Sequence, residues 1–363
     1  MIKNTINSLD QFFFRPDPMN SLGIFRLVIL IYIFWFRLPI YQNSLYVDCH
    51  LPMELLTHPS FVLHILPLPY PLEKTYIPLF MQIFRIVCFF AGVGLFTRIS
   101  LFVSTLCYLY AGAGASSWSS FNHHNILEVY ALVIFTFAPG SSAWSLDYLI
   151  KNFIKNNWIN FLSSLKGTPK ARWGKQCLLL VFIFIYFASG TSKLRHTGIR
   201  WMNGNTLAYY LQEKNPVVPS PLAGPSTPTN SFLYVDSSKF KEINIQKQNC
   251  RGTSRVERAQ AWKDGFGLEY ILYNNRRSEK APIAQIHWLM IILSVMVFTF
   301  ELFSPLMIIE GMIRNFMLLF SIGMHTGVML LRGEKFIAYI VVAGLFFGDS
   351  IINKGFSRKK NSH

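Results

Sequence analysis

The sequence predicts an all-α integral membrane protein, a polytopic bundle of about eight transmembrane helices with one long extracytoplasmic loop. Apolar residues make up 52% of the 363 residues, aromatic residues 16% and charged residues only 14%. Apolar runs that approach the roughly 20 residues needed to span a bilayer recur along the whole chain. The predicted spans are 22–40, 77–96, 99–118, 126–139, 177–192, 286–309, 313–331 and 336–347.

The positive charge of the chain reports its orientation. A formal charge of +16 is compatible with a nucleic-acid partner, but the cations are spread over both ends and the short connections, without aromatic interleaving. We therefore expect no nucleic acid and a surrounding of membrane lipid. Short connections rich in Lys and Arg stay on the cytoplasmic side, and those carrying Arg98 and the cations of 151–175 fall on one side. Both termini are expected to be cytoplasmic, in the plasma membrane or a bacterial inner membrane.

The chain reads as one membrane domain, 1–363, without internal repeats or a cleavable signal peptide, so the first span is expected to direct insertion. Residues 193–285 are predicted to be an extracytoplasmic loop insertion, and 350–363 a basic cytoplasmic tail. The proline-rich stretch 215–229 cannot form a helix or a central strand. A loop of this length is either functional or disordered, and the sequence leaves both possibilities open.

Lys193 is the most informative residue, because it closes an apolar run that is too long and too hydrophobic for a surface helix. Burial beside hydrocarbon disfavours the ammonium form, so a lysine here can serve as a neutral base. The alternative is snorkelling, in which the stem lies along lipid and the ammonium reaches the headgroups. The cluster Trp201-Met202-Asn203-Gly204 at the mouth of this span favours the base.

Other ionisable residues are embedded in apolar sequence, namely Arg26, Arg37, Arg85, Glu128, Glu301 and His325. Each charge at bilayer depth costs about 2.5–3.5 kcal/mol, so several of them must pair or line a polar cavity. Structural ion pairs are one interpretation, for example Arg85 with Glu128 or Glu301. A second group lies near the outward face and could converge on one pocket with Lys193, namely His124, Trp118 and Trp201.

The histidines and cysteines give weaker signals. No metal site is expected, because His123 and His124 are adjacent and point in different directions on a helix. Three cysteines lie in or next to predicted spans and are expected to be small buried apolar side chains, namely Cys88, Cys107 and Cys177. Cys49 and Cys250 lie in outward polar loops, where an oxidising compartment permits a disulfide.

Several short motifs, in this order over 15–331, resemble the membrane domain of vitamin K-dependent gamma-glutamyl carboxylases, also called the horizontally transferred transmembrane (HTTM) domain. The motifs are Arg15-Pro16-Asp17-Pro18, Ser21-Leu22-Gly23-Ile24-Phe25-Arg26, Asp48-Cys49, Arg98-Ile99-Ser100, Ser117-Trp118, His124, Trp144-Ser145-Leu146-Asp147, Tyr186-Phe187, Gly190, Ser192-Lys193-Leu194, Trp201 with Gly204, Glu301, Arg314 and His325. Glu301 stands where the carboxylases have an aspartate.

The resemblance implies a reaction and a site. In the family, the lysine matching Lys193 deprotonates a reduced naphthoquinone, a vitamin K-type quinol, with the histidine matching His124 nearby. Oxygen then converts the quinol to an epoxide through a strong base that removes a carbon-bound proton, and the carbanion takes up carbon dioxide. The resemblance also implies a disulfide between Cys49 and Cys250. It implies supporting roles around the pocket for Trp118, Trp201, Gly204, Glu301, His325 and Arg26.

Departures from the family pattern keep the function open. Asn203 stands where the carboxylases have an acidic residue, a single lysine replaces a lysine pair, and the large luminal region has no counterpart here. Fold transfers between relatives better than substrate does. We expect a quinol- and oxygen-dependent carboxylase or epoxidase acting on a peptide or small substrate. The alternative is a membrane accessory factor for the maturation or export of a peptide, without quinone chemistry, whose partner is a small exported peptide or a separate soluble protein.

Overall fold

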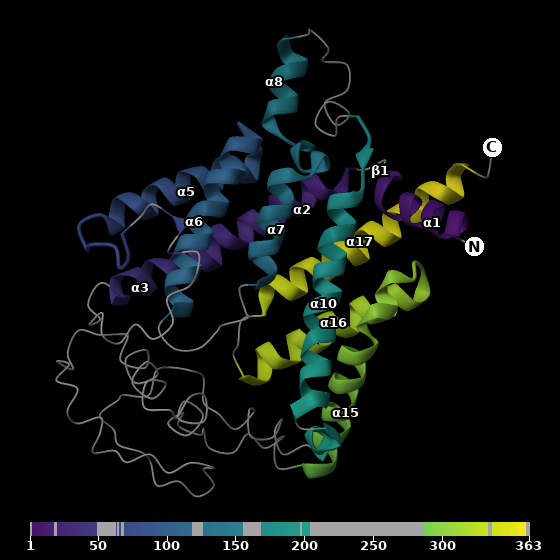
Figure 1. Ribbon diagram of the computed structural model, residues 1–363. Helices are drawn as coiled ribbons and strands as arrows, with labels where there is room; N and C mark the ends of the chain where they lie inside the picture. The colour runs from purple at the N-terminus through teal and green to yellow at the C-terminus, as the bar shows by residue number, and fades with distance from the viewer. Residues whose placement is uncertain are drawn as a thin grey trace, which may run out of the picture.

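The computed structural model describes residues 2–17, 20–48, 63, 65–66, 69–117, 126–154, 168–196, 198–203, 286–332 and 336–360. Nearly all of them are helical (Figure 1), as predicted. In the described part of the chain four helices are long and apolar enough to cross a membrane, namely Ser21–Gln42, Trp173–Arg195, Trp288–Ile308 and Met312–Leu330. Shorter apolar helices are Ile77–Val93, Ile126–Phe137 and Ile337–Ile352. The number of membrane crossings stays a prediction.

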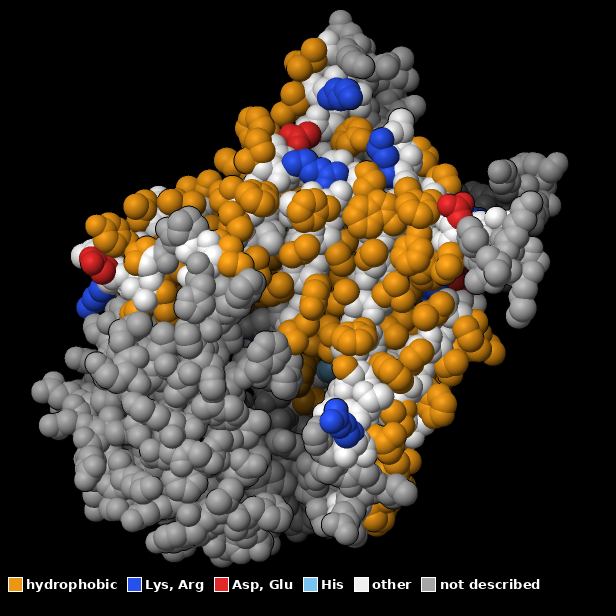
Figure 2. All heavy atoms as spheres, viewed as in Figure 1, with side chains coloured by type: hydrophobic (Ala, Val, Ile, Leu, Met, Phe, Trp, Pro, Cys, Tyr) orange, Lys and Arg blue, Asp and Glu red, His pale blue; other side chains and the backbone are white. Residues whose placement is uncertain are grey.

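The outer surface agrees with a membrane environment. Figure 2 shows a broad band of hydrophobic side chains over the visible flank of the helices, with Lys and Arg side chains toward the ends of this band. Large apolar side chains of these helices, such as Phe184, Trp288 and Phe316, are each more than half exposed, at 67%, 64% and 65%. Because hydrocarbon rather than water can cover such a band, the distribution supports a membrane protein.

The first half of the bundle is built around a long interrupted helix. Helix α2 (Ser21–Tyr32) continues through a π-helical turn, η1 (Ile33–Arg37), into α3 (Leu38–Asp48). It packs against α5 (Ile77–Val93) and α6 (Thr97–Ser117), and α7 (Ile126–Phe137) packs against α6. Gly94 caps the C-terminal end of α5, with a φ of +75° that a residue with a side chain rarely adopts.

The second half contains α10 (Trp173–His196), η5 (Gly198–Asn203), α15 (His287–Phe303), η7 (Ser304–Ile308), α16 (Met312–Arg332) and α17 (Ile337–Lys360). Proline in the first turn of η7 explains why the predicted span 286–309 is a helix followed by a 3₁₀ turn. Helix α10 packs on both α7 and α15, and therefore joins the two halves. Helix α17 returns to α2, where the rings of Phe346 and Phe25 meet edge to face at 5.0 Å.

Small elements complete one end of the bundle. These are α1 (Ile2–Phe14), β1 (Pro16–Asp17), η4 (Pro139–Ser142), α8 (Leu146–Ile154) and β2 (Lys170–Ala171). The two strands pair antiparallel, with Pro16 opposite Ala171. The Asp147 carboxylate accepts hydrogen bonds from the backbone N–H groups of Phe96 and Thr97 at 2.9 and 2.8 Å. It therefore caps α6 and fixes the start of α8 to that corner.

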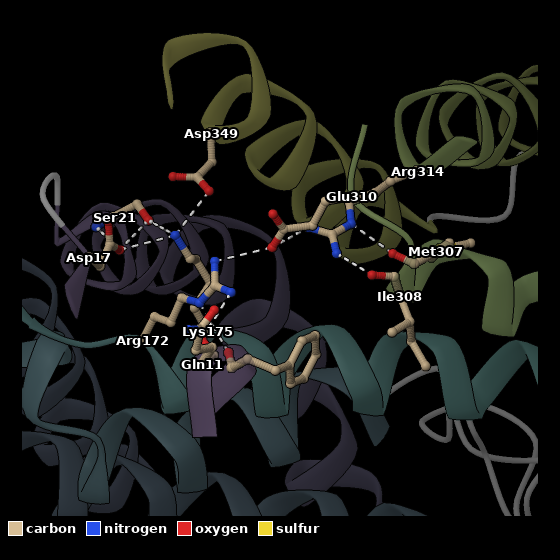
Figure 3. A network of polar contacts seen from close by, with 11 residues as sticks. Gln11, Asp17, Ser21, Arg172, Lys175, Met307, Ile308, Glu310, Arg314 and Asp349 are labelled. Atoms are coloured by element: carbon tan, nitrogen blue, oxygen red, sulfur yellow. Dashed lines mark hydrogen bonds and ion pairs between the residues drawn. The ribbon is translucent and has the colours of Figure 1, made fainter. Parts of the chain in front are cut away.

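A network of charged side chains lies at this end (Figure 3). Lys175 Nζ donates to Asp17 Oδ2 at 3.1 Å, to Ser21 Oγ at 3.1 Å and to Asp349 Oδ2 at 3.0 Å. Beside it Arg172 pairs with Glu310 at 3.1 Å. The network ties the segment before α2 to α10 and α17.

Three boundaries differ from the sequence prediction. Lys175 was expected in a connection but is buried inside α10, because two carboxylates balance its charge. The same helix runs on beyond residue 192 to His196, and residues 198–203 of the predicted loop form η5. Residues 350–360 of the predicted tail are the last turns of α17.

The cysteine predictions are tested in part. Cys88 and Cys107 are buried, as expected, and Cys177 is half-buried; all three are free thiols. Cys49 and Cys250 lie outside the described residues, as does the loop from 204 to 285. The predicted disulfide and the predicted loop layout therefore stay predictions.

We expect acid to weaken the fold through Asp17. Burial alone raises the pKa of this carboxyl, but Lys175 and the hydrogen bonds from Ser21 outweigh it, so the pKa lies below the usual 3.8. A group with a depressed folded-state pKa stabilises fully above its unfolded pKa, and this stability is lost as the pH falls through the folded value. Thermal unfolding of the detergent-solubilised protein at stepwise lower pH should show this loss, and Asp17→Asn should remove that part of the slope. Identical slopes for both proteins would contradict the assignment.

Candidate functional site

The centre of the candidate site is an ion pair between Lys193 and Glu301. Lys193 lies in the last turn of α10, and its Nζ donates to Glu301 Oε1 at 2.5 Å and to Oε2 at 2.6 Å. The Glu301 side chain is 8% exposed and that of Lys193 is 22% exposed. The carboxylate is therefore the deeper partner, and the lysine reaches it from the more open side.

Close packing of α10 against α15 brings the pair together. A Cβ placed on Gly190 would lie 2.9 Å from Glu301 Cβ and 3.0 Å from the backbone nitrogen of Leu302. Such distances leave no room for a side chain, so glycine is required at this crossing. The Ser304 hydroxyl, at the start of the 3₁₀ turn η7 that follows α15, donates to the Ile183 carbonyl of α10 at 3.2 Å and gives a second contact between the two segments.

Further contacts shape the surroundings of the lysine. Lys193 Nζ lies 4.3 Å from the centre of the Trp201 ring, which stacks on Phe298 with ring centres 6.3 Å apart. An ammonium over an indole face is attracted by the ring quadrupole. The Ser189 hydroxyl donates to Glu301 Oε1 at 3.1 Å. The arrangement can hold a proton on a nitrogen or an oxygen beside an apolar surface.

His325, in α16, packs against the same face of α10 through Tyr186. The Tyr186 hydroxyl shares a hydrogen bond of 2.5 Å with His325 Nε2 and another of 2.8 Å with Ser321 Oγ. The rings of Phe336 and Tyr339 lie 5.0 and 4.9 Å from the imidazole. Tyr186, Ser189 and Lys193 are spaced so that they fall on one side of a helix. The structure thus places Trp201, Glu301 and His325 along the α10 face that carries Lys193.

Arg26 lies elsewhere. Its fully buried guanidinium donates to the carbonyls of Ser141, Trp144 and Gly92 at 2.5, 2.9 and 3.3 Å. These carbonyls belong to η4, the turn before α8 and the end of α5. Arg26 therefore satisfies backbone groups at helix ends, and its contacts do not reach the Lys193 pair.

The ion pair of Arg37 with Glu128 was not foreseen. Arg37 Nε and Nη2 donate to Glu128 Oε1 at 2.8 and 2.5 Å, and the Tyr32 hydroxyl donates to the same oxygen at 3.2 Å. The expectation that Arg85 pairs with Glu128 or Glu301 is wrong, because both carboxylates bind other cations. The Arg85 guanidinium instead donates to the side-chain oxygen of Gln42. Both partners of Glu128, Tyr32 and Arg37, thus come from α2 and its π-helical turn, a pairing that apolar patterning does not reveal.

Three predicted site residues, His124, Trp118 and Gly204, lie outside the described part of the chain, so the approach of His124 to Lys193 stays a prediction. Within the described residues no group of three or more His, Cys, Asp or Glu side chains could hold a metal ion. Comparison of the chain with protein-family models, with curated proteins and with solved structures found no match.

We expect Arg37→Met to destabilise the protein by about 3–5 kcal/mol, because it leaves the carboxylate of Glu128 buried and unpaired. The double variant Arg37→Met, Glu128→Leu should recover most of this loss, since no buried charge remains. Unfolding in a denaturant series in detergent measures both. Lys151→Met, at an exposed position of α8, is the control and should change stability by less than about 0.5 kcal/mol. Equal stability of the single and double variants would contradict the pairing argument.

Proposed function

We propose that the chain is a multi-pass membrane enzyme that deprotonates a lipid-soluble quinol at Lys193, in an oxygen-dependent reaction similar to that of vitamin K-dependent carboxylases. The observation that carries the proposal is the Lys193–Glu301 pair, set at the end of an apolar helix and covered by the Trp201 ring. The motif resemblance supports it, because Lys193, Glu301 and Trp201 are among the matching positions. A reduced naphthoquinone, when bound, would supply an acidic hydroxyl and, with oxygen and carbon dioxide, the later carboxylation chemistry.

The pair explains how a lysine can act as a base in this setting. For Lys193 to act as a base, its proton would pass along the hydrogen bond to a Glu301 oxygen, which removes two opposite charges from a poorly solvated place. In that form the Lys193 amine can accept the proton of a substrate hydroxyl. The resulting ammonium is then stabilised by the Trp201 ring, and the Ser189 hydroxyl keeps Glu301 oriented.

The alternative role is that of a membrane accessory factor in the maturation or export of a peptide. One observation favours it: Lys193 donates to both carboxylate oxygens, the geometry of an ion pair that only joins α10 to α15. In that case the lysine needs its charge and not its basicity. The two roles therefore predict different outcomes when arginine replaces Lys193, because arginine keeps the charge but cannot deprotonate.

Lys193→Arg is therefore expected to abolish activity while the protein still inserts and folds. Lys193→Ala should also be inactive, and Lys151→Arg, at an exposed site on α8, should be fully active. Loss of a general base typically lowers a rate by about 10²–10⁴-fold. Mass spectrometry of membranes with and without each variant should search for quinone epoxide and for a peptide that gains one carboxylate. Activity that survives Lys193→Arg would contradict the role of Lys193 as a base and would favour the accessory role.

The proposed topology has both termini in the cytoplasm, about eight spans, and residues 193–285 on the outer side. It rests on the one-sided distribution of cations in the short connections. Reporters fused after His363 and within 215–229 should be active on opposite sides of the membrane. A reporter after His363 that works only on the outer side would reverse the orientation.

A further inference from the structure

Arg85 is a cation on the outer flank of an apolar helix. The inward face of α5 is apolar and buried, formed by Ile77, Met81, Phe84, Cys88 and Ala91. On the opposite side Leu79, Ile83, Ile86 and Phe89 are exposed by 56%, 44%, 47% and 55%. Arg85 is also exposed and lies in the middle of this 17-residue helix. A guanidinium among lipid-facing side chains requires a polar partner.

The only partner that the described residues give this guanidinium is neutral. Arg85 Nη2 donates to Gln42 Oε1 at 2.5 Å. Gln42 is the last residue of the first candidate span, Ser21–Gln42. The guanidinium therefore lies at the level where that span ends, although its own Cα lies mid-helix. An arginine in this position can extend toward a headgroup region, as long cationic side chains do at membrane edges.

The charge of Arg85 is left without a counter-ion by the described chain. The ion pairs of that part of the protein use other cations, namely Arg37, Arg172, Lys175, Lys193 and Arg314. The Gln42 amide oxygen satisfies one N–H group of the guanidinium but does not neutralise its positive charge. A guanidinium has five N–H donors, and two of them match the oxygens of a phosphate. The amide nitrogen of Gln42 supplies a further donor beside them.

We propose that Arg85 and Gln42 bind the headgroup phosphate of an anionic membrane phospholipid at this edge of the bundle. Helix length supports a lipid as the occupant. At 1.5 Å per residue α5 is about 25 Å long, shorter than a hydrocarbon core of about 30 Å. A short helix draws the headgroups inward by local thinning, which brings phosphates toward Arg85. The exposed apolar side chains around it then contact the acyl chains of the same lipid.

The test is lipid retention measured by native mass spectrometry. Protein purified in mild detergent is mixed with phosphatidylglycerol or with phosphatidylcholine, and bound lipids are counted. The wild type should retain phosphatidylglycerol in preference to phosphatidylcholine. Arg85→Gln should lower phosphatidylglycerol retention by about ten-fold, the effect expected for one lost charge-assisted contact. Lys151→Gln, which removes an exposed cation from α8, is the matched control and should retain lipid as the wild type does.

A second variant separates lipid binding from a folding defect. Gln42→Leu keeps the Arg85 cation but removes the amide oxygen that accepts its hydrogen bond. This variant should lower phosphatidylglycerol retention by a smaller factor than Arg85→Gln does, at an unchanged melting temperature. Three results would overturn the proposal. They are equal retention of the two lipids by the wild type, undiminished phosphatidylglycerol retention by Arg85→Gln, or a change of oligomeric mass in Arg85→Gln without a change in bound lipid. The third result would mean that the exposed side of α5 contacts a second copy of the chain rather than a lipid.

Discussion

Neutralisation of buried charge is the constraint on which the rest of this structure depends. The apolar bundle contains cations that hydrocarbon cannot solvate, and each deep one meets an acceptor from another part of the chain. Arg37 meets Glu128, Lys193 meets Glu301, and Lys175 is shared by Asp17 and Asp349. Arg26 meets backbone carbonyls instead. Because an unpaired charge at such depth costs several kcal/mol, these contacts fix which helices are neighbours more strictly than apolar packing does.

The candidate site is one instance of this general pairing with two additional features. Glycine at position 190 brings two helices so close that a lysine and a carboxylate meet, and a tryptophan from the following turn covers the nitrogen. Among the other buried pairs of the described residues, Arg37 lies 5.6 Å from the centre of the Tyr32 ring, farther than Lys193 lies from the Trp201 ring. Of the two lysines in the candidate span Trp173–Arg195, Lys193 has the more exposed side chain, at 22% against 7% for Lys175.

Apolar patterning predicted the helices well, because burial in lipid requires long runs of apolar residues whatever their partners are. It identified Lys193, Glu301 and His325 as unusual, since an ionisable residue inside such a run stands out. It could not predict the partners. Whether Glu128 faces Arg37 or Arg85 depends on how each helix is rotated, and the π-helical turn at Ile33–Arg37 changes that rotation without a clear sequence signal. Lys175 was placed in a connection because a charge was read as a boundary, whereas here two aspartates allow it inside a helix.

The network at Lys175 has a consequence for biogenesis. Helices enter the membrane in the order of synthesis, and α17 is the last of the described helices to emerge. Asp17 is available to Lys175 as soon as α10 is inserted, but Asp349 arrives only with α17. The packing of α17 on α2, which includes the contact of Phe346 with Phe25, also forms only then. A chain shortened before α17 would therefore lack one of the two carboxylates that pair with Lys175 and the packing of α17 on α2, and we expect it to be incompletely folded.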